Sequence, residues 1–160
     1  MQNTPELLRR LLDAGFEFVV VGGVAAIAHG SASFTVDFDV VASLTVENCR
    51  LLLKALDGLE PRFYQTPGRP PMRRTAEELA QFKNVYLDTT LGRIDVLGSL
   101  PPVGTFADVA RRALTVQLFG HSCRIVSLDD LITVKAHVGR PKDKQVELEL
   151  RAIRERMKKS

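Results

Sequence analysis

A short apolar run that ends in two consecutive glycines constrains the fold of this chain more than any other feature. Residues 16–21 read Phe-Glu-Phe-Val-Val-Val, a composition that predicts one buried strand. Gly22 and Gly23 end the run, and the small side chains of residues 24–29 predict a closely packed helix that stops at Gly30. In this layout, bare backbone N–H groups can receive a phosphate. A plain tight turn between a packed strand and helix fits the same residues, so both interpretations stay open.

Two familiar phosphate-binding motifs are excluded by the residues around these glycines. No Lys-Ser or Lys-Thr pair follows a glycine loop, so the segment is not a P-loop. The glycine spacing does not match the dinucleotide-binding fingerprint either. A phosphate site at this turn would therefore have to be of another type.

Two aspartates alternate with apolar residues in the next segment, residues 35–40, and the alternation predicts a strand. The apolar face would carry Val36, Phe38 and Val40, and the opposite face Thr35, Asp37 and Asp39. Residues two apart on one strand face are roughly 6–7 Å apart at Cα, close enough for both carboxylates to hold divalent cations. Oxygen ligands favour Mg²⁺ or Mn²⁺ over Zn²⁺. An ordinary solvated strand face is the alternative for this triplet.

A third acidic residue, Asp95, lies in another predicted strand. Residues 91–97 alternate so that Asp95 falls on the face opposite Ile94 and Val96. Residues 84–88 predict the preceding strand, and residues 89–92 predict a hairpin turn between the two. Asp95 is expected either to join the first two carboxylates or to form an ordinary ion pair with Arg93 or Arg124.

Together these segments resemble the signature of the DNA polymerase beta-type nucleotidyltransferase superfamily. The likeness lies in Gly22-Gly23, the alanine-rich helix ending at His29-Gly30, and the Thr-x-Asp-x-Asp run at 35–39. Within the superfamily the chain is most similar to small nucleotidyltransferase-like proteins related to AbiEii-type toxins. Two segments resemble the C-terminal tail of those proteins: residues 130–135, Asp-Leu-Ile-Thr-Val-Lys, and residues 139–143, Gly-Arg-Pro-Lys-Asp.

This resemblance implies an NTP-dependent enzyme that transfers a nucleoside monophosphate and releases pyrophosphate, with Mg²⁺ or Mn²⁺ as cofactor. Asp37, Asp39 and Asp95 would be the catalytic and metal-binding residues, and Asp95 would also help to activate the attacking hydroxyl. The implied nucleotide-binding residues are Gly22, Gly23, Thr35, Lys135 and Arg140. Solvated helix charges are the alternative for the last two. The implied acceptors are an RNA such as a tRNA end, a protein hydroxyl or a small molecule.

The chain departs from the family pattern at two positions. Ser33 stands where related sequences usually carry an arginine, and serine supplies no fixed positive charge to a phosphate. Val146 stands where an acidic residue is often found. These departures favour a second hypothesis, a catalytically inactive relative that acts as a binding or regulatory protein, for instance one component of a toxin–antitoxin pair.

A stretch without acidic residues, Arg62 to Arg74, is expected to form an irregular, mobile loop. Its centre, Thr-Pro-Gly-Arg-Pro-Pro at residues 66–71, is rich in residues that break regular structure. The loop precedes the strand of Asp95, so its arginines could lie across a cleft and bind triphosphate or nucleic acid. An uncommitted solvated surface is the alternative for this stretch and for the basic C-terminal tail.

Length and composition predict one domain over residues 1–160, and the order of elements predicts an α+β fold with helices packed on a mixed sheet. The resemblance implies that this domain is nucleotidyltransferase-like. The chain has 160 residues, 45% of them hydrophobic, and a net charge of +3. No apolar run is long enough for a membrane span, and the start lacks the regions of a signal peptide. Cys49 and Cys123 are expected to be reduced thiols in a cytoplasmic protein.

Further elements are predicted from their start and stop signals. Helices are expected from Thr4-Pro5 to Gly15, over 44–56 with Ser43 or Thr45 as the cap, from Thr105, over 129–137 with Ser127 as the cap, and from Pro141. Residues 114–118 and 124–126 are expected to form a hairpin joined by residues 119–122.

Overall fold

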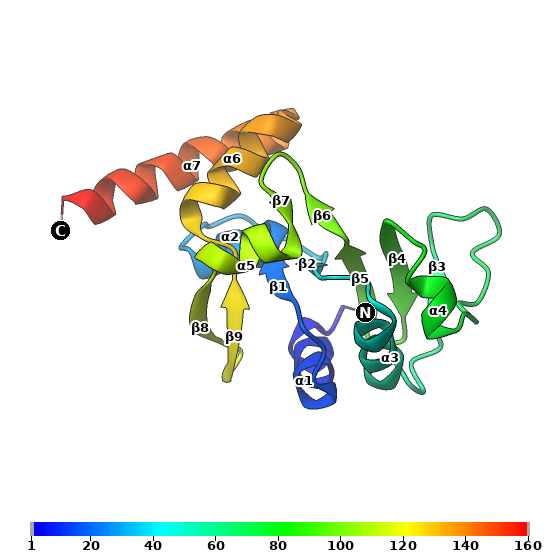
Figure 1. Ribbon diagram of the computed structural model, residues 1–160. Helices are drawn as coiled ribbons and strands as arrows, with labels where there is room; N and C mark the ends of the chain where they lie inside the picture. The colour runs from blue at the N-terminus through cyan, green and yellow to red at the C-terminus, as the bar shows by residue number, and fades with distance from the viewer. Residues whose placement is uncertain (1, 160) are drawn as a thin grey trace.

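A mixed β-sheet with helices packed around it forms the fold, as the sequence predicted. The computed structural model describes residues 2–159, and within them the main sheet has seven strands (Figure 1). In spatial order the strands are β3 (Arg62–Phe63), β4 (Asn84–Thr89), β5 (Gly92–Leu97), β2 (Asp39–Val41), β1 (Val19–Val21), β9 (His121–Ile125) and β8 (Leu114–Leu118). A separate pair consists of β6 (Ser99–Leu100) and β7 (Gly104–Thr105).

The helices lie at both ends and along the sides of this sheet (Figure 1). They are α1 (Thr4–Ala14), α2 (Gly22–Ala28), α3 (Val46–Ala55), α4 (Ala76–Leu79), α5 (Phe106–Arg112), α6 (Leu128–Val138) and α7 (Pro141–Lys158). In the view of Figure 1, α1 and α3 lie below the sheet, and α6 and α7 lie above it. No helix within residues 2–159 has the length and apolar character needed to cross a membrane.

The pairing of β1, β2 and β5 at the centre of the sheet positions the candidate site. Strand β2 runs antiparallel to β1, with Asp39 opposite Val21, and parallel to β5, with Asp39 beside Asp95. Strand β1 ends at Val21 and α2 begins at Gly22, so the predicted strand–glycine–helix order is confirmed.

Core residues cover both faces of the central strands: Val19 and Val41 are buried on the face of these aspartates, and the opposite face is apolar throughout. Phe38, Val40, Ile94 and Val96 are all 0% exposed, which confirms the predicted alternation around Asp39 and Asp95. The prediction was wrong for Val36, which is 53% exposed. Because β1 is only three residues long, the residues before Asp39 have no partner on that side, and β2 begins at Asp39.

The local signals for helix starts were largely correct. Thr45 caps α3, Ser127 caps α6, and Thr105 begins α5 with a capping box. The first helix differs, because the side chain of Asn3, and not Thr4, accepts the N–H of Glu6. The β8–β9 hairpin was predicted with too long a loop. Its turn is Phe119-Gly120, both with positive φ, and β9 already begins at His121.

The stretch from Arg62 to Arg74 is more ordered than predicted. Its first residues form β3, which pairs with β4, and a bridge joins Arg62 to Pro71. Arg69 forms an ion pair with Asp88, and Arg74 lies over the rings of Phe63 and Phe82. The stretch is therefore fastened along the edge of the sheet by its own arginines.

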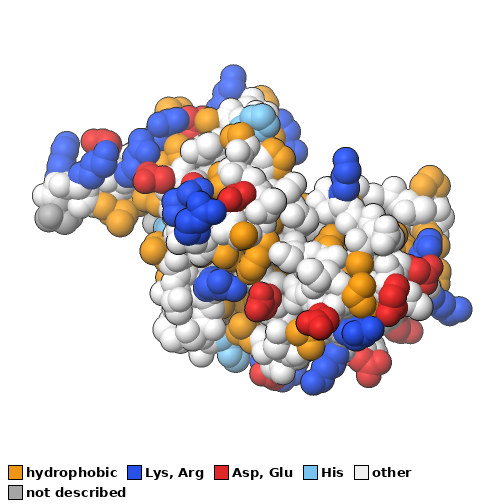
Figure 2. Space-filling view, viewed as in Figure 1, with side chains coloured by type: hydrophobic (Ala, Val, Ile, Leu, Met, Phe, Trp, Pro, Cys, Tyr) orange, Lys and Arg blue, Asp and Glu red, His pale blue; other side chains and the backbone are white. Residues whose placement is uncertain are grey.

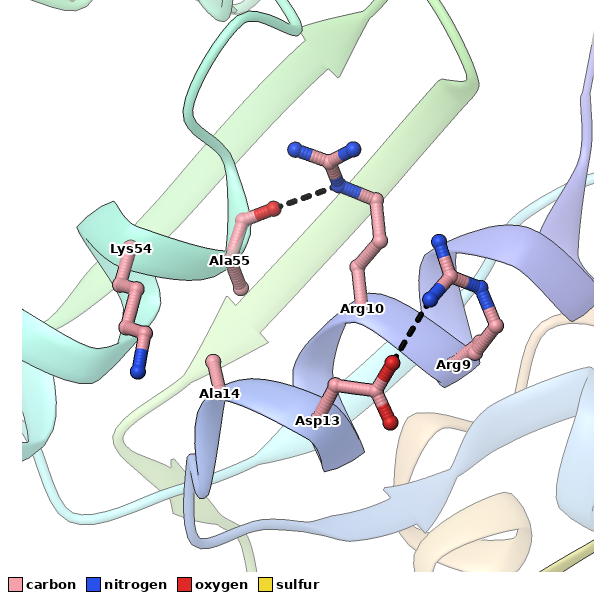
Figure 3. A pocket seen from close by; sticks show the side chains of 6 residues that line it. All are labelled: Arg9, Arg10, Asp13, Ala14, Lys54 and Ala55. Carbon is pink, nitrogen blue, oxygen red and sulfur yellow. Dashed lines mark hydrogen bonds and ion pairs between the residues drawn. The ribbon is translucent and has the colours of Figure 1, made fainter.

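A hollow of about 200 Å³ lies between α1 and α3, and neither Asp39 nor Asp95 lines it (Figure 3). Some of the polar side chains that line it bind to other groups of the protein. The guanidinium of Arg10 donates to the backbone oxygens of Ala55 and Asp57, where α3 ends. Arg9 forms an ion pair with Asp13. These contacts give the hollow a structural role, because Arg10 satisfies carbonyl groups that the end of a helix leaves free.

Asn48 is a buried polar side chain that the sequence did not single out. It is 7% exposed, accepts the N–H of Glu17, and donates to the carbonyl oxygens of Glu17 and Ser43. It thereby joins α3 to the segments that lead into β1 and out of β2.

We expect Asn48→Ala to lower the free energy of unfolding by about 2–3 kcal/mol, because it leaves buried backbone groups without partners. Chemical denaturation measures this change. Glu47→Ala, at the exposed neighbouring position, is the control and should stay within about 0.5 kcal/mol of the parent. Equal effects of the two substitutions would contradict the role of Asn48.

Candidate active site

Asp39 and Asp95 lie side by side at the centre of the sheet. They are paired in register on the parallel strands β2 and β5, so their side chains leave the same face. The chain is fastened at this point because the N–H of Asp95 donates to the carbonyl oxygen of Phe38, at 2.9 Å. Two of the three predicted carboxylates are therefore brought together by strand pairing.

The two glycines make room for the side chains that face them. A Cβ on Gly22 would come within 2.5 Å of Asp39 Oδ2, and Gly22 has a positive φ of 64°. A Cβ on Gly23 would come within 2.7 Å of Thr35 Oγ1. The glycine turn, Thr35 and Asp39 thus form one closely packed unit, and side chains at the glycines would displace it.

Asp37 does not lie on a strand as the sequence predicted, although it lines the same hollow as Asp39. It precedes β2 in an irregular segment and is exposed, so it does not share a strand face with Asp39. Its N–H is held by Thr35 Oγ1 at 3.3 Å. The physical reason is again the shortness of β1, which leaves Asp37 without a partner strand on that side. Its negative charge still acts on both other aspartates.

Burial and like charges make Asp39 a weak acid. Burial, followed by the charges of Asp95 and Asp37, raises the pKa of Asp39 from 3.8 to about 7. Burial also raises the pKa of Asp95, and Asp37 adds to the shift, while a hydrogen bond from Tyr64 opposes it. Asp39 Oδ1 is buried and has no hydrogen-bond partner among residues 2–159. A proton or a cation would relieve both the repulsion and the missing partner.

These oxygens fit a hard divalent cation such as Mg²⁺ or Mn²⁺. The support is the unpartnered Oδ1 of Asp39 together with the neighbouring carboxylate of Asp95. Among residues 2–159, no three acidic, histidine or cysteine side chains already stand close enough to form a complete metal cluster.

Tyr64 is a site residue that sequence reasoning missed. Its hydroxyl donates to Asp95 Oδ1 at 2.6 Å, and the guanidinium of Arg93 lies 4.2 Å from the centre of its ring. The ring also contacts Tyr86 edge-on, with centroids 6.3 Å apart. Neither predicted ion pair of Asp95, with Arg93 or with Arg124, occurs among the contacts of the described residues. No local pattern around Tyr64 predicts this contact, because it joins positions 31 residues apart.

A buried carboxylate, Asp143, holds the two basic residues that were predicted near the nucleotide. Asp143 is 3% exposed, and its oxygens accept from Lys135 Nζ at 3.3 Å and Arg140 Nε at 2.7 Å. Burial raises the pKa of Asp143, but Arg140 and Lys135 outweigh it and hold that pKa below its ordinary value. Lys135, on α6, is largely buried in this contact, whereas Arg140, at the start of α7, pairs with Asp143 through a side chain that is still 75% exposed.

Two adjoining hollows share Asp39, Lys135, Arg140 and Asp143. The first, of about 110 Å³, is polar, and its further lining includes Gly23, Ser33, Thr35, Asp37 and Lys142. The second, of about 360 Å³, is mainly apolar, and its further lining includes Leu97, Leu100, Leu131, Val134 and Val138. Basic groups thus face the carboxylates across a small cavity, with an apolar recess next to it.

Ser33 is bound to the protein rather than directed at a ligand. The carboxylate of Glu149, on α7, accepts from the hydroxyls of Ser31 and Ser33 and from the N–H of Ala32. Lys142 lines the same hollow as Ser33 and offers a positive charge there. Lys142 and Asp143 were visible in the sequence as part of the 139–143 tail, but only the fold shows that they face this hollow.

The outer face of α7 does not form an unbroken basic surface. Figure 2 shows Lys and Arg side chains along α7 at the upper left of the view, with acidic side chains among them. Arg151 pairs with Glu147, Lys158 with Glu155, and Arg154 with Asp129. This mixture is typical of a solvated helix face.

No protein-family model matches the chain, and no curated protein matches it.

We expect Asp39→Asn to stabilise the protein at pH 8, and this gain should shrink as the pH falls and be small below pH 4. The raised pKa means that the folded state binds the proton of Asp39 more tightly than the unfolded state does. The stabilisation that this proton gives to the parent protein is fully present below pH 4 and is lost as the pH rises through 7. Asparagine removes the repulsion, and the melting temperature should rise by about 2–4 °C for each kcal/mol gained.

Melting curves across this pH range measure the effect in metal-free buffer. Asp57→Asn, at an exposed position, controls for the loss of one negative charge. A constant difference between Asp39→Asn and the parent at all pH values would refute the assigned repulsion.

Gly22→Ala should destabilise the protein more than Gly15→Ala, by about 1–3 kcal/mol. Both glycines have positive φ, 64° and 80°, so both substitutions impose backbone strain. Only at Gly22 does the added methyl group meet Asp39, while nothing lies within 4 Å of the Cβ at Gly15. Denaturant titration of the two variants makes the comparison, and equal losses would show that the close approach at Gly22 is unimportant.

Proposed function

We propose that this protein is a divalent-cation-dependent nucleotidyltransferase that moves a nucleoside monophosphate from an NTP to a hydroxyl acceptor. The observation that carries the proposal is the pairing of Asp39 with Asp95 on one sheet face, at a cavity that Asp39 lines together with Lys135 and Arg140. Phosphoryl-type transfer needs positioning and charge neutralisation more than covalent chemistry, and this site offers groups of both charges.

The polar hollow suits the triphosphate. Gly23 lines it without a side chain, and Lys135, Arg140 and Lys142 bring positive charge to it. Asp143 fixes the first two of these, which lowers the entropy cost of ordering them around phosphate. The apolar recess beside it, lined by Leu131 and Val138, suits a nucleobase.

Asp37, Asp39 and Asp95 would hold the cations. Bound there, Mg²⁺ or Mn²⁺ would neutralise charge on the triphosphate and stabilise the leaving pyrophosphate. Asp39 offers its unpartnered Oδ1, and Asp95 stands next to it in register. The protein's own contribution at the acceptor side is the carboxylate of Asp95, which already holds a hydroxyl hydrogen bond and can take the proton of an attacking hydroxyl.

A second candidate, a nucleotide-binding regulatory protein without transfer activity, is favoured by Ser33. Its hydroxyl is engaged with Glu149, and no guanidinium occupies the position where related sequences usually carry one. This candidate and the enzyme both predict nucleotide binding. They differ in whether the α-phosphate becomes covalently attached to an acceptor.

We expect Mg²⁺ or Mn²⁺ together with a matching NTP to raise the melting temperature by about 5–10 °C at roughly 100-fold excess over Kd. The double variant Asp37→Ala, Asp39→Ala should lose this rise, because it removes the cation ligands. Asp57→Ala with Asp129→Ala removes the same charge outside the site and should keep the rise. A melting temperature that no NTP and metal combination changes would rule out the nucleotide site.

Transfer itself is tested by incubating the protein with NTPs labelled at the α-phosphate, Mg²⁺ or Mn²⁺, and a cell extract. An enzyme should label an acceptor and release pyrophosphate, and the Asp37→Ala, Asp39→Ala variant should do neither. Stabilisation by NTP without any labelled product would favour the regulatory candidate instead.

A further inference from the structure

The hydroxyl of Tyr64 is hydrogen-bonded to a carboxylate of the candidate site. It donates to Asp95 Oδ1 at 2.6 Å, and Asp95 is the carboxylate that the proposed function assigns to the attacking hydroxyl. The phenol is half-buried, and Arg93 lies over its ring. Tyr64 is therefore held in place rather than free to sample the solvent.

Tyr64 and the basic groups approach the carboxylates from different parts of the fold. Tyr64 follows β3, at the end of the sheet formed by β3, β4 and β5, and its ring contacts Tyr86 of β4. Lys135 and Arg140 come from α6 and the start of α7 and line the two hollows with Asp39. Asp39 touches the hollows and neighbours Asp95, so it stands between the triphosphate side and the phenol.

We propose that Tyr64 is an intramolecular acceptor, so that the protein attaches a nucleoside monophosphate to its own phenolic hydroxyl. This inference rests on the proposed nucleotidyltransferase function and adds to it a specific acceptor. The segment that carries Tyr64 is fastened to the sheet edge by the Arg69–Asp88 ion pair and the bridge between Arg62 and Pro71. These contacts hold the phenol at Asp95 in the absence of any other molecule.

The reaction balances without an added oxidant or reductant. The Tyr64 oxygen forms a bond to the α-phosphorus of the NTP, the bond from that phosphorus to the bridging oxygen of the β-phosphate breaks, and pyrophosphate leaves. The phenolic proton passes to Asp95 along the existing hydrogen bond. The product is a phosphodiester whose negative charge lies near the guanidinium of Arg93.

The chain offers a matched control for this residue. It has two tyrosines, and the second, Tyr86, sits opposite Asp95 on β4 but has its hydroxyl bound to the side-chain amide of Asn84 at 3.1 Å. Tyr86 thus shares residue type and neighbourhood with Tyr64 and lacks the contact with Asp95. Trypsin separates the two, because Arg62 and Lys83 precede different peptides.

The experiment incubates the purified full chain with each of ATP, GTP, CTP and UTP, labelled at the α-phosphate, with MgCl₂ or MnCl₂ and no extract. Intact-mass measurement and tryptic mass spectrometry should find a single nucleotide on the peptide that begins at Phe63. Tyr64→Phe should lose the label, Tyr86→Phe should keep it, and Asp95→Asn should lose it. Melting curves with NTP and metal on every variant report binding independently of transfer.

The outcomes separate this inference from the proposed function. If Tyr64→Phe retains the NTP-induced rise in melting temperature and loses the label, the inference is supported. If NTP stabilises the parent but the chain stays unlabelled, or the label lies on another residue such as Thr35, the inference is overturned and nucleotide binding stands. If no NTP stabilises or labels the protein, both proposals fall.

Mixing two inactive variants tests whether the transfer is intramolecular. The Asp39→Ala chain keeps the Tyr64 acceptor but lacks a complete cation site. The Tyr64→Phe chain keeps the cation site but lacks the acceptor. A mixture of the two should remain unlabelled, and the half-time of labelling of the parent should not depend on protein concentration. Labelling of the Asp39→Ala chain in the mixture would overturn the intramolecular step.

Discussion

The repulsion between two neighbouring carboxylates, Asp39 and Asp95, is the interaction on which the rest of the site depends. Strand pairing forces them together, and partial burial weakens the screening of their charges by water. The consequence is a pKa of about 7 at Asp39 and an oxygen of Asp39 without a partner. Holding two carboxylates together at the centre of the fold lowers its stability, and a bound proton or divalent cation would offset that loss.

The surrounding elements divide this centre into two sides with different chemistry. On one side Asp143 binds Lys135 and Arg140, and both basic side chains line the hollow beside Asp39. On the other side Tyr64 gives Asp95 a hydrogen bond. A nucleotide on the first side and a hydroxyl on the second would meet across the carboxylates, which is the geometry that the proposed transfer requires.

Local signals predicted those parts of the fold that depend on neighbouring residues. Helix caps at Thr45, Thr105 and Ser127 were correct because a cap uses a side chain and an N–H only three positions away. The Asp39 and Asp95 strands were correct because a buried face imposes alternation. The strand predicted at Asp37 was wrong, since the length of a strand depends on its partner, and β1 ends too early to extend β2.

The sequence alone determined the α+β class, the strand–glycine–helix order and the faces of Asp39 and Asp95, because these follow from periodicity and from the conformational freedom of glycine. It also drew attention to Lys135 and Arg140. Only the tertiary structure decided that Asp39 and Asp95 are neighbours, that Asp143 orders the basic pair, and that Tyr64 reaches Asp95. Those contacts join residues distant along the chain, and strand register and helix packing, which no local pattern encodes, bring them together.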